Sequence, residues 1–296
     1  MQHIDLTIDL LGAQLLSPVL NASGTLGLGG CRVVGMDFLR FGALVTKTVT
    51  LKPRAGNTGL RLWEVPNGLV NRIGLENSGI EVFLAKELPQ WLSFGPPVIV
   101  NISGFTIQEF VELVKRLNGS RIIAIEVNLS CPNVEHGMAL SQDPKLTFEI
   151  VSELVKVSEL PLIIKLTPNV DEIGAIAQAA QKAGASAISA INTIKHTVRG
   201  DSGEVIITGG LSGPVIMPTA LKKVGQICQA VKIPVIGMGG ISTGADAVKF
   251  LQAGATAVAV GTASFRDPFA IQRIYGEIKG WMSKGGYSSL ADIPRN

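Results

Sequence analysis

The sequence predicts an α/β protein of the (β/α)8 class, the TIM barrel. Short apolar runs recur along the 296 residues, and most are followed by a turn rich in Gly, Asn or Ser and then by a stretch of helical periodicity. Strands that alternate with helices indicate a parallel sheet, and eight such runs match the strand number of this barrel. The runs also end in polar or glycine residues, which favours a barrel over a doubly wound sheet because strand ends converge on one face of a barrel.

The expected strands are Pro18–Ala22, Ala43–Lys47, Pro97–Ile102, Ile122–Asn128, Pro161–Leu166, Ser186–Asn192, Pro234–Met238 and Thr256–Gly261. Apolar residues recur every three or four positions in the expected helices, so that one face of each can cover the barrel. These helices are Gln108–Leu117, Lys145–Val157, Asp171–Lys182, Pro218–Val231 and Thr243–Gln252. Strict alternation from Ile4 to Leu10 predicts a strand of a small N-terminal hairpin that closes the barrel floor. The segment from Lys195 to Gly210 is charged and contains glycine, so we expect a long loop there.

Composition and charge exclude several classes of protein. Hydrophobic residues make up 46% of the chain, which is enough for one large core, and we expect residues 1–296 to form a single domain. The formal charge is +3 and no basic tract occurs, so nucleic acid is not an expected partner. No targeting segment or bilayer-spanning apolar stretch is visible, so we expect a cytoplasmic protein with no membrane partner.

Residues unsuited to a core stand at the ends of the eight runs. They are Ser23, Lys47, Asn101, Asn128, Lys165, Asn192, Gly239 and Gly261. Strands often end in polar turns, but two lysines and three asparagines together indicate a functional site at the barrel mouth. The lysine stems could simply pack while their ammonium groups reach water. At barrel strand ends, however, the ammonium groups would point into the cavity and offer charge to an anionic ligand or a reduced cofactor.

Cys131 differs from the other two cysteines, Cys31 and Cys228, in its context. The three lie far apart, with no spacing for a disulfide framework, a zinc site or an iron–sulfur site. An isolated cysteine is usually an inert buried residue, which is our interpretation of Cys228. Cys131 follows the expected strand Ile122–Asn128, and Pro132 prevents the strand from continuing. This thiol is therefore expected on a loop at the functional face, where it can act as a base or nucleophile if its pKa is lowered.

Glycines follow the seventh and eighth runs, in Gly237–Gly240 and at Gly261 before Thr262. Loops after these two barrel strands commonly bind phosphate through backbone N–H groups. Glycine also serves plain tight turns, so the pair of positions is a stronger indication than either alone. No Gly-x-Gly-x-x-Gly fingerprint follows a strand, so a dinucleotide site is not expected, and the three histidines lack metal-ligand spacing.

Several motifs, taken in chain order, resemble those of the dihydroorotate dehydrogenase family. They are Thr46-Lys47-Thr48, Asn71 to Asn77, Asn128 to Asn133 with His136-Gly137, Asn192-Thr193, Gly209 to Pro214 and Gly239-Gly240. The resemblance covers nearly the whole chain. The Ser-Cys-Pro-Asn string with the following His-Gly is similar to that of the NAD-linked class 1B, whose catalytic subunit works with an electron-transfer subunit.

The resemblance implies the residues of a cofactor site, a substrate site and a base. Flavin mononucleotide (FMN) would contact Ser23, Lys47, Thr48, Asn101, Asn128, Lys165, Ile191, Gly213, Gly239, Gly240, Gly261 and Thr262. Dihydroorotate would contact Lys47, Asn71, Arg72, Ile73, Gly74, Leu75, Asn128, Asn192 and Thr193. Cys131 would remove the C5 proton while a hydride passes from C6 to flavin N5. Lys165 would stabilise negative charge near flavin N1.

The resemblance also implies a partner. This chain has neither a dinucleotide fingerprint nor four clustered cysteines, so electrons would reach NAD through a subunit that carries FAD and an iron–sulfur cluster. A homodimer of this chain inside a heterotetramer is expected, acting in pyrimidine (UMP) biosynthesis. The charged segment from Lys195 to Asp201, Ser78 and Met217 depart from the family pattern, which puts contacts near the barrel mouth in doubt.

Three alternatives stay open from sequence alone. One is a stand-alone enzyme that passes electrons to fumarate. Another is a flavoenzyme similar to dihydropyrimidine dehydrogenase that acts on uracil or thymine, although Asn133 stands where that group usually has His. The third is a barrel without redox chemistry, such as an isomerase or aldolase that uses Lys165, which bound flavin would exclude.

Overall fold

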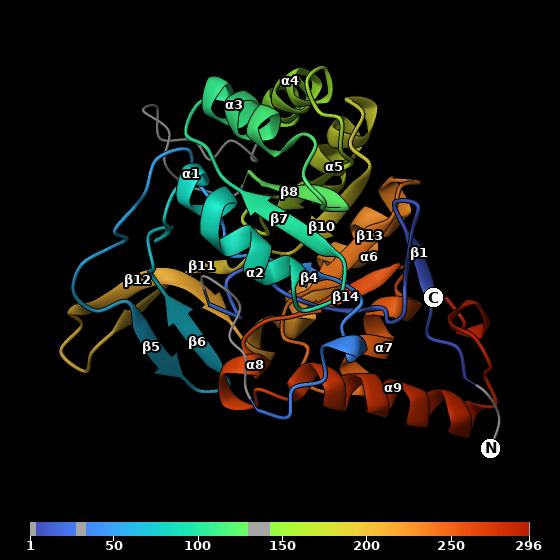
Figure 1. Ribbon diagram of the computed structural model, residues 1–296. Coiled ribbons are helices and arrows are strands. Elements are labelled where there is room, and N and C mark those ends of the chain that lie inside the picture. The colour runs from blue at the N-terminus through green and yellow to red at the C-terminus, as the bar shows by residue number, and fades with distance from the viewer. Residues whose placement is uncertain (1–3, 28–33, 130–142, 296) are drawn as a thin grey trace.

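The computed structural model describes residues 4–27, 34–129 and 143–295 (Figure 1). Its centre is an eight-stranded parallel sheet in the order β3-β14-β13-β10-β9-β8-β7-β4. The strands are β3 (Val19–Asn21), β4 (Leu44–Val45), β7 (Val98–Ile102), β8 (Ala124–Asn128), β9 (Leu162–Leu166), β10 (Ala187–Ala190), β13 (Val235–Met238) and β14 (Ala257–Val260). Each lies inside one of the eight apolar runs, so the predicted barrel and its strands are confirmed.

The first and last strands of this order, β3 and β4, meet along a seam. The Gly42 N–H donates to the Val19 carbonyl oxygen at 2.8 Å. Above it, the Asn21 side chain donates to the Val45 carbonyl oxygen at 2.7 Å and accepts from the Val45 N–H at 2.9 Å. A Cβ at position 42 would lie only 2.0 Å from the Ser17 carbonyl oxygen, so glycine is required there. One amide side chain thus supplies hydrogen bonds that a longer strand backbone would otherwise make.

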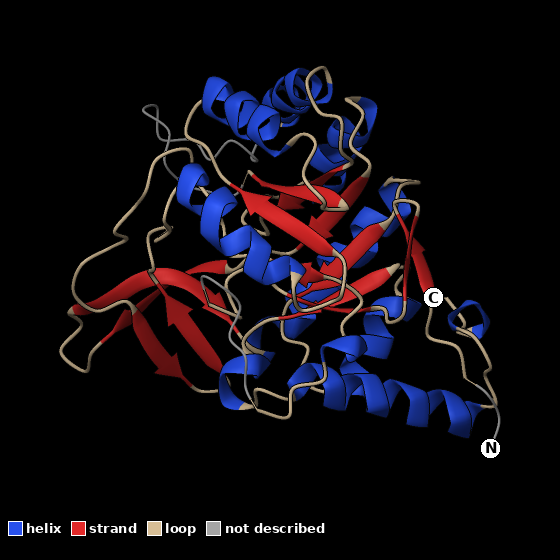
Figure 2. Cartoon of the chain, in the orientation of Figure 1, coloured by secondary structure: helices blue, strands red, loops and turns tan. Residues whose placement is uncertain are grey.

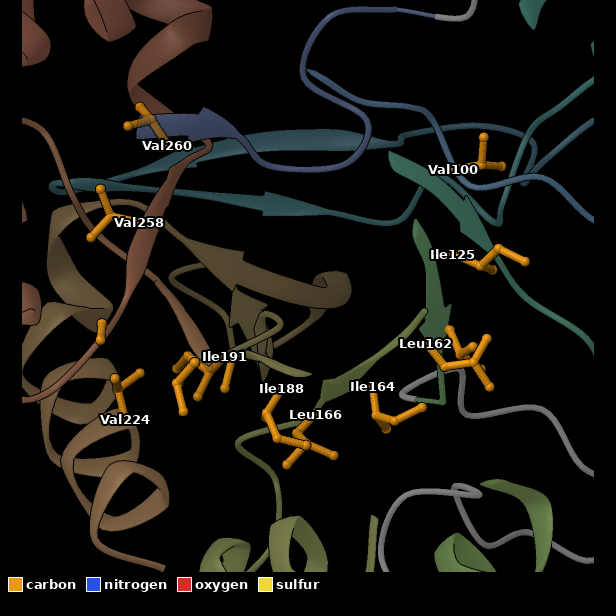
Figure 3. Packing of buried hydrophobic residues seen from close by; sticks show 14 of the residues in the cluster. Val100, Ile125, Leu162, Ile164, Leu166, Ile188, Ile191, Val224, Val258 and Val260 are labelled. Carbon is orange, nitrogen blue, oxygen red and sulfur yellow. The ribbon is translucent and has the colours of Figure 1, made fainter. Parts of the chain in front are cut away.

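Helices cover the outer face of the barrel (Figure 2). The five expected helices are confirmed as α3 (Ile107–Leu117), α4 (Pro144–Val155), α5 (Ile173–Lys182), α6 (Met217–Ala230) and α7 (Gly244–Gln252). The chain also forms α1 (Ile80–Val82), a π-helical turn (Phe83–Glu87), α2 (Leu88–Leu92), α8 (Ala263–Arg266) and α9 (Ala270–Gly285). Outward strand residues such as Val100, Ile125 and Ile164 pack in the apolar layer between sheet and helices (Figure 3).

An N-terminal hairpin closes the barrel floor, as predicted. It consists of β1 (Ile8–Leu10) and β2 (Ala13–Leu15), which pair antiparallel. Its first strand begins at Ile8 and not at Ile4, and Asp5 forms a separate bridge with Ser289. Leu10 and Leu15 are fully buried and pack with the inward-facing apolar residues of the barrel.

A four-stranded antiparallel sheet lies beside the barrel (Figure 1). It contains β5 (Leu62–Val65), β6 (Gly68–Asn71), β11 (Ile194–Arg199) and β12 (Val205–Ser212), in the order β11-β12-β6-β5. The prediction of a long loop from Lys195 to Gly210 was therefore wrong. Three consecutive exposed residues from Lys195 to Thr197 hide the alternation of β11, and the partner of this hairpin, β6, is far away in sequence.

Candidate active site at the barrel mouth

Three predicted site residues lie on neighbouring strands at the barrel mouth. Asn101 lies on β7, Asn128 ends β8 and Lys165 lies on β9, where it is paired in register with Asn128. All three side chains are buried. Asn128 also meets Asn192 just after β10, whose Nδ2 lies 3.5 Å from the Asn128 Oδ1. The barrel thus brings together four of the residues expected at strand ends.

A buried carboxylate that the sequence analysis missed, Glu126, lies one pleat below Asn128. Its side chain accepts hydrogen bonds from Asn101 Nδ2 on β7 and from Ser189 Oγ on β10, the latter at 2.7 Å. The Lys165 Nζ lies 3.5 Å from Glu126 Oε2. Glu126 was detectable in principle, because a charged residue inside the apolar run 122–128 is as unusual as Lys165 is in its own run. Glu126 lies within β8, whereas the site was predicted from residues at the ends of the apolar runs.

The Asn101 side chain has one unsatisfied end. Its Nδ2 is held by Glu126, and its Oδ1 is buried without a hydrogen-bond partner among the described residues. A buried acceptor left without a donor typically costs about 1–3 kcal/mol. An N–H group of a ligand at the barrel mouth would remove this cost.

Lys47 lies beside this buried layer, in the segment that follows β4. Burial is the main cause that lowers the pKa of Lys47 from its usual value. Glu76 opposes the shift, while the nearby charges of Lys165 and Arg61 add to it. Because a bound anion would favour the charged ammonium, this environment suits an anionic ligand.

Ser23 and Thr48 flank Lys47. The Ser23 hydroxyl donates to the Thr46 carbonyl oxygen at 2.8 Å and lies 3.4 Å from the Thr48 Oγ1. A Cβ on Gly24 would lie within 3.6 Å of the Lys47 Nζ, so the loop after β3 passes directly beside the lysine. The structure therefore brings Ser23, Lys47 and Thr48 together.

The segment from Asn71 to Leu75 leaves β6 in a constrained conformation. Leu75 has φ +58°, which is uncommon for a residue with a side chain. The buried Asn77 holds it, since its Nδ2 donates to the Leu75 carbonyl oxygen at 2.7 Å. A Cβ on Gly74, at φ +79°, would lie 2.6 Å from the Asn57 backbone nitrogen. Backbone strain that the surroundings hold in place is typical of ligand-binding segments.

Asn71 and Thr193, both expected to contact substrate, meet at Gly210 on β12. The Asn71 Nδ2 donates to the Gly210 carbonyl oxygen at 3.1 Å. The Thr193 hydroxyl fills the space where a Cβ of residue 210 would lie. Arg72 does not join this group, because its side chain is exposed and donates to the Thr58 carbonyl oxygen at 3.1 Å.

Three glycines predicted to contact FMN lie beside the start of α6, and two of them, Gly239 and Gly240, belong to an expected phosphate loop. Gly213, Gly239 and Gly240 have φ values of +98°, +123° and +81°, which favour glycine. A Cβ on Gly239 would lie 2.6 Å from the Ala220 Cβ and 3.2 Å from a side-chain carbon of Ile191. The loop after β13 thus packs so closely that larger residues do not fit.

Gly261 and Thr262 follow β14, and Thr262 precedes α8. Thr262 lines a cavity of about 610 Å³. Its lining includes Thr262, Pro214, Trp63, Leu69 and Phe265. Of the residues predicted to contact FMN, Thr262 therefore lines this cavity.

Cys131, the expected base, lies outside the described residues, as do Cys31 and His136. Cys228 lies on α6, where burial raises the pKa of its thiol to about 11 and keeps it protonated at neutral pH.

The described ranges, 4–27, 34–129 and 143–295, contain neither a candidate metal site nor a candidate membrane span. There, no group of three or more His, Cys, Asp or Glu side chains is arranged to hold a metal ion. No helix in this part of the chain has the length and apolar character needed to span a membrane.

Comparisons with known proteins identify one family. Residues 5–282 match the family model of dihydroorotate dehydrogenase. Dihydroorotate dehydrogenase B (NAD(+)), catalytic subunit, from Caldicellulosiruptor saccharolyticus is 44% identical, with 99% of each chain covered. The protein of the same name from Geobacter sulfurreducens is 43% identical, with 99% of this chain and 98% of that chain covered.

A solved structure supports the fold. The crystal structure of DHODH from Eimeria tenella in complex with ferulenol superposes with a TM-score of 0.81 at 23% identity, covering 98% of this chain and 88% of that one. The family match spans most of the sequence, and the relatives are similar over their full length. The chain belongs to the dihydroorotate dehydrogenase family, as its motifs predicted.

Proposed function

We propose that this chain oxidises dihydroorotate to orotate with FMN as its cofactor, as the catalytic subunit of an NAD-linked enzyme of pyrimidine (UMP) biosynthesis. The observation that carries the proposal is the buried set Asn101, Asn128 and Lys165 at the mouth of a barrel whose full-length relatives bear this name. We further propose that residues 1–296 work as one domain, since the candidate substrate residues come from both the barrel and the sheet beside it.

FMN fits the residues at the mouth. The unpartnered Oδ1 of Asn101 can accept from the N3–H of an isoalloxazine ring. The Lys165 ammonium offers positive charge to the reduced ring. The left-handed backbone at Gly239 and Gly240 lets the main chain approach a phosphate closely. The proposed FMN contacts are Ser23, Lys47, Thr48, Asn101, Asn128, Lys165, Ile191, Gly213, Gly239, Gly240, Gly261 and Thr262.

The asparagine amides and the Lys47 ammonium suit dihydroorotate as a ligand. Asparagine amides both donate and accept, which matches the imide edge of the substrate, and the Lys47 ammonium pairs with its carboxylate. Binding of that carboxylate raises the lowered pKa of Lys47 again. The proposed substrate contacts are Lys47, Asn71, Arg72, Ile73, Gly74, Leu75, Asn128, Asn192 and Thr193.

The proposed chemistry separates two tasks. The Cys131 thiolate takes the proton from C5 of the substrate as a general base. Bound FMN supplies the acceptor for the hydride that leaves C6. Lys165 holds a positive charge at the end of β9, where it favours added negative charge on the cofactor. Asn128 and Asn192 orient the substrate between these groups.

We expect the purified chain to be yellow and to lose its flavin absorbance when dihydroorotate is added without oxygen. A matched control is dihydrouracil, which lacks the carboxylate that Lys47 would bind and should leave the spectrum unchanged. Bleaching by dihydrouracil in place of dihydroorotate would favour the dihydropyrimidine dehydrogenase alternative. A colourless chain that binds no added FMN would contradict the proposal.

Electron transfer to NAD is proposed to need a partner subunit with FAD and an iron–sulfur cluster, in a heterotetramer built on a homodimer of this chain. The isolated chain should therefore be reduced by dihydroorotate but reduce NAD poorly, because it carries no dinucleotide fingerprint. Steady-state assays with NAD and with fumarate as acceptors test this. Rapid turnover with either acceptor in the absence of a second subunit would contradict it.

A further inference from the structure

Glu126 is a buried carboxylate that has no role in the proposed reaction. Among the described residues, Glu126 and Lys165 are the only charged side chains that are buried, at 2% and 5% exposure. A buried ion pair is often no more stabilising than apolar residues of similar size, so stability alone is a weak reason for this pair. The partners of Glu126 indicate another reason.

The Glu126 carboxylate connects three strands. It accepts from Asn101 on β7 and from Ser189 on β10, and it pairs with Lys165 on β9. Two of these three partners, Asn101 and Lys165, are proposed FMN contacts. Ser189 is fully buried, and its hydroxyl donates to Glu126 Oε1 while Asn101 and Lys165 approach Oε2. These contacts fix the orientation of the carboxylate against the two side chains that are proposed to contact FMN.

The charges of Lys165 and Glu126 affect the midpoint potential of a redox cofactor bound beside them. Lys165 alone would present a full positive charge to FMN and favour the reduced, anionic ring. A carboxylate at 3.5 Å cancels part of that charge, and buried charges are screened little by solvent. We propose that Glu126 is a positioning residue for the redox step, which holds Lys165 and Asn101 in place and lowers the midpoint potential of bound FMN. This inference rests on the proposed function.

The test is the midpoint potential of FMN in Glu126→Gln, measured by reductive titration with dithionite, which needs no substrate. Loss of the negative charge should favour binding of reduced over oxidised FMN by at least about tenfold, which for a two-electron couple is an upward shift of about 30 mV. Glu126→Asp keeps the charge and should stay near the parent potential. Glu277→Gln, on α9, is the matched control, since Glu277 pairs with Arg273 at the protein surface.

A second pair of variants covers the case in which Glu126→Gln does not fold. Lys165→Met and the double variant Lys165→Met/Glu126→Gln differ only in the Glu126 charge, and the double variant should have the higher potential. In the apoprotein, the double variant should also melt at a higher temperature than Lys165→Met, because no buried charge is left alone.

The inference is overturned if Glu126→Gln retains FMN at the parent potential, or if the Gln and Asp variants shift alike. In either case, a parent chain that is still bleached by dihydroorotate would leave the proposed function standing. A parent chain that binds no FMN would overturn the proposed function and this inference with it.

Discussion

Cys131→Ala is expected to slow the reduction of FMN by dihydroorotate about 10²–10⁴-fold at neutral pH, which is the usual contribution of a general base. FMN should stay bound, because none of the proposed cofactor contacts is Cys131. Anaerobic stopped-flow measurement of the flavin absorbance gives the rate, and the spectrum before mixing gives the FMN content.

Cys228→Ala is the matched control for this variant. Cys228 is half-buried on α6, and its thiol remains protonated at neutral pH because burial raises its pKa to about 11. The parent rate is therefore expected. Near-parent rates in Cys131→Ala as well would show that another group takes the C5 proton.

Lys165→Ala is expected to destabilise the apoprotein by about 3–5 kcal/mol, because removal of one partner leaves Glu126 as an unpaired buried charge. FMN should bind more weakly, and its midpoint potential should fall, since a cation near the ring favours the reduced form. Denaturant unfolding of the apoprotein and titration with FMN measure the two effects.

An exposed lysine provides the control for Lys165. Lys249 pairs with Asp246 at 3.5 Å, but its side chain is 52% exposed, and Lys249→Ala should cost at most about 1 kcal/mol. Equal stability and equal FMN affinity of the Lys165→Ala variant and the parent would mean that Lys165 has neither role.

The parallel barrel was predictable because its strands are buried on both faces and appear as continuous apolar runs. The same burial made Lys165 and Asn101 conspicuous at the ends of those runs. Each of these inferences needs only local sequence, which is why the eight strands and the mouth residues could be found without a structure.

The sheet beside the barrel could not be found in this way. β5 is largely exposed and β11 interrupts its alternation with exposed polar residues, so neither has a clear apolar face. β12 pairs with β6, and the Asn71–Gly210 hydrogen bond joins residues 139 positions apart. The contacts of Glu126 with three strands depend on barrel register in the same way. Periodicity within one segment carries no information on such partners.

The sheet of β5, β6, β11 and β12 can change in evolution separately from the barrel strands. Its two hairpins are insertions that follow β4 and β10, the second and sixth strands of the barrel along the chain. Asn71 and Thr193, proposed for substrate, belong to these insertions. Asn101 and Lys165, proposed for FMN, belong to the barrel strands, as does Asn128, which is proposed for both. Barrel enzymes diverge mainly through such loops. A descendant of this chain could therefore alter part of its substrate contacts by exchange of two peripheral hairpins, while the barrel strands that carry Asn101, Asn128 and Lys165 are inherited unchanged.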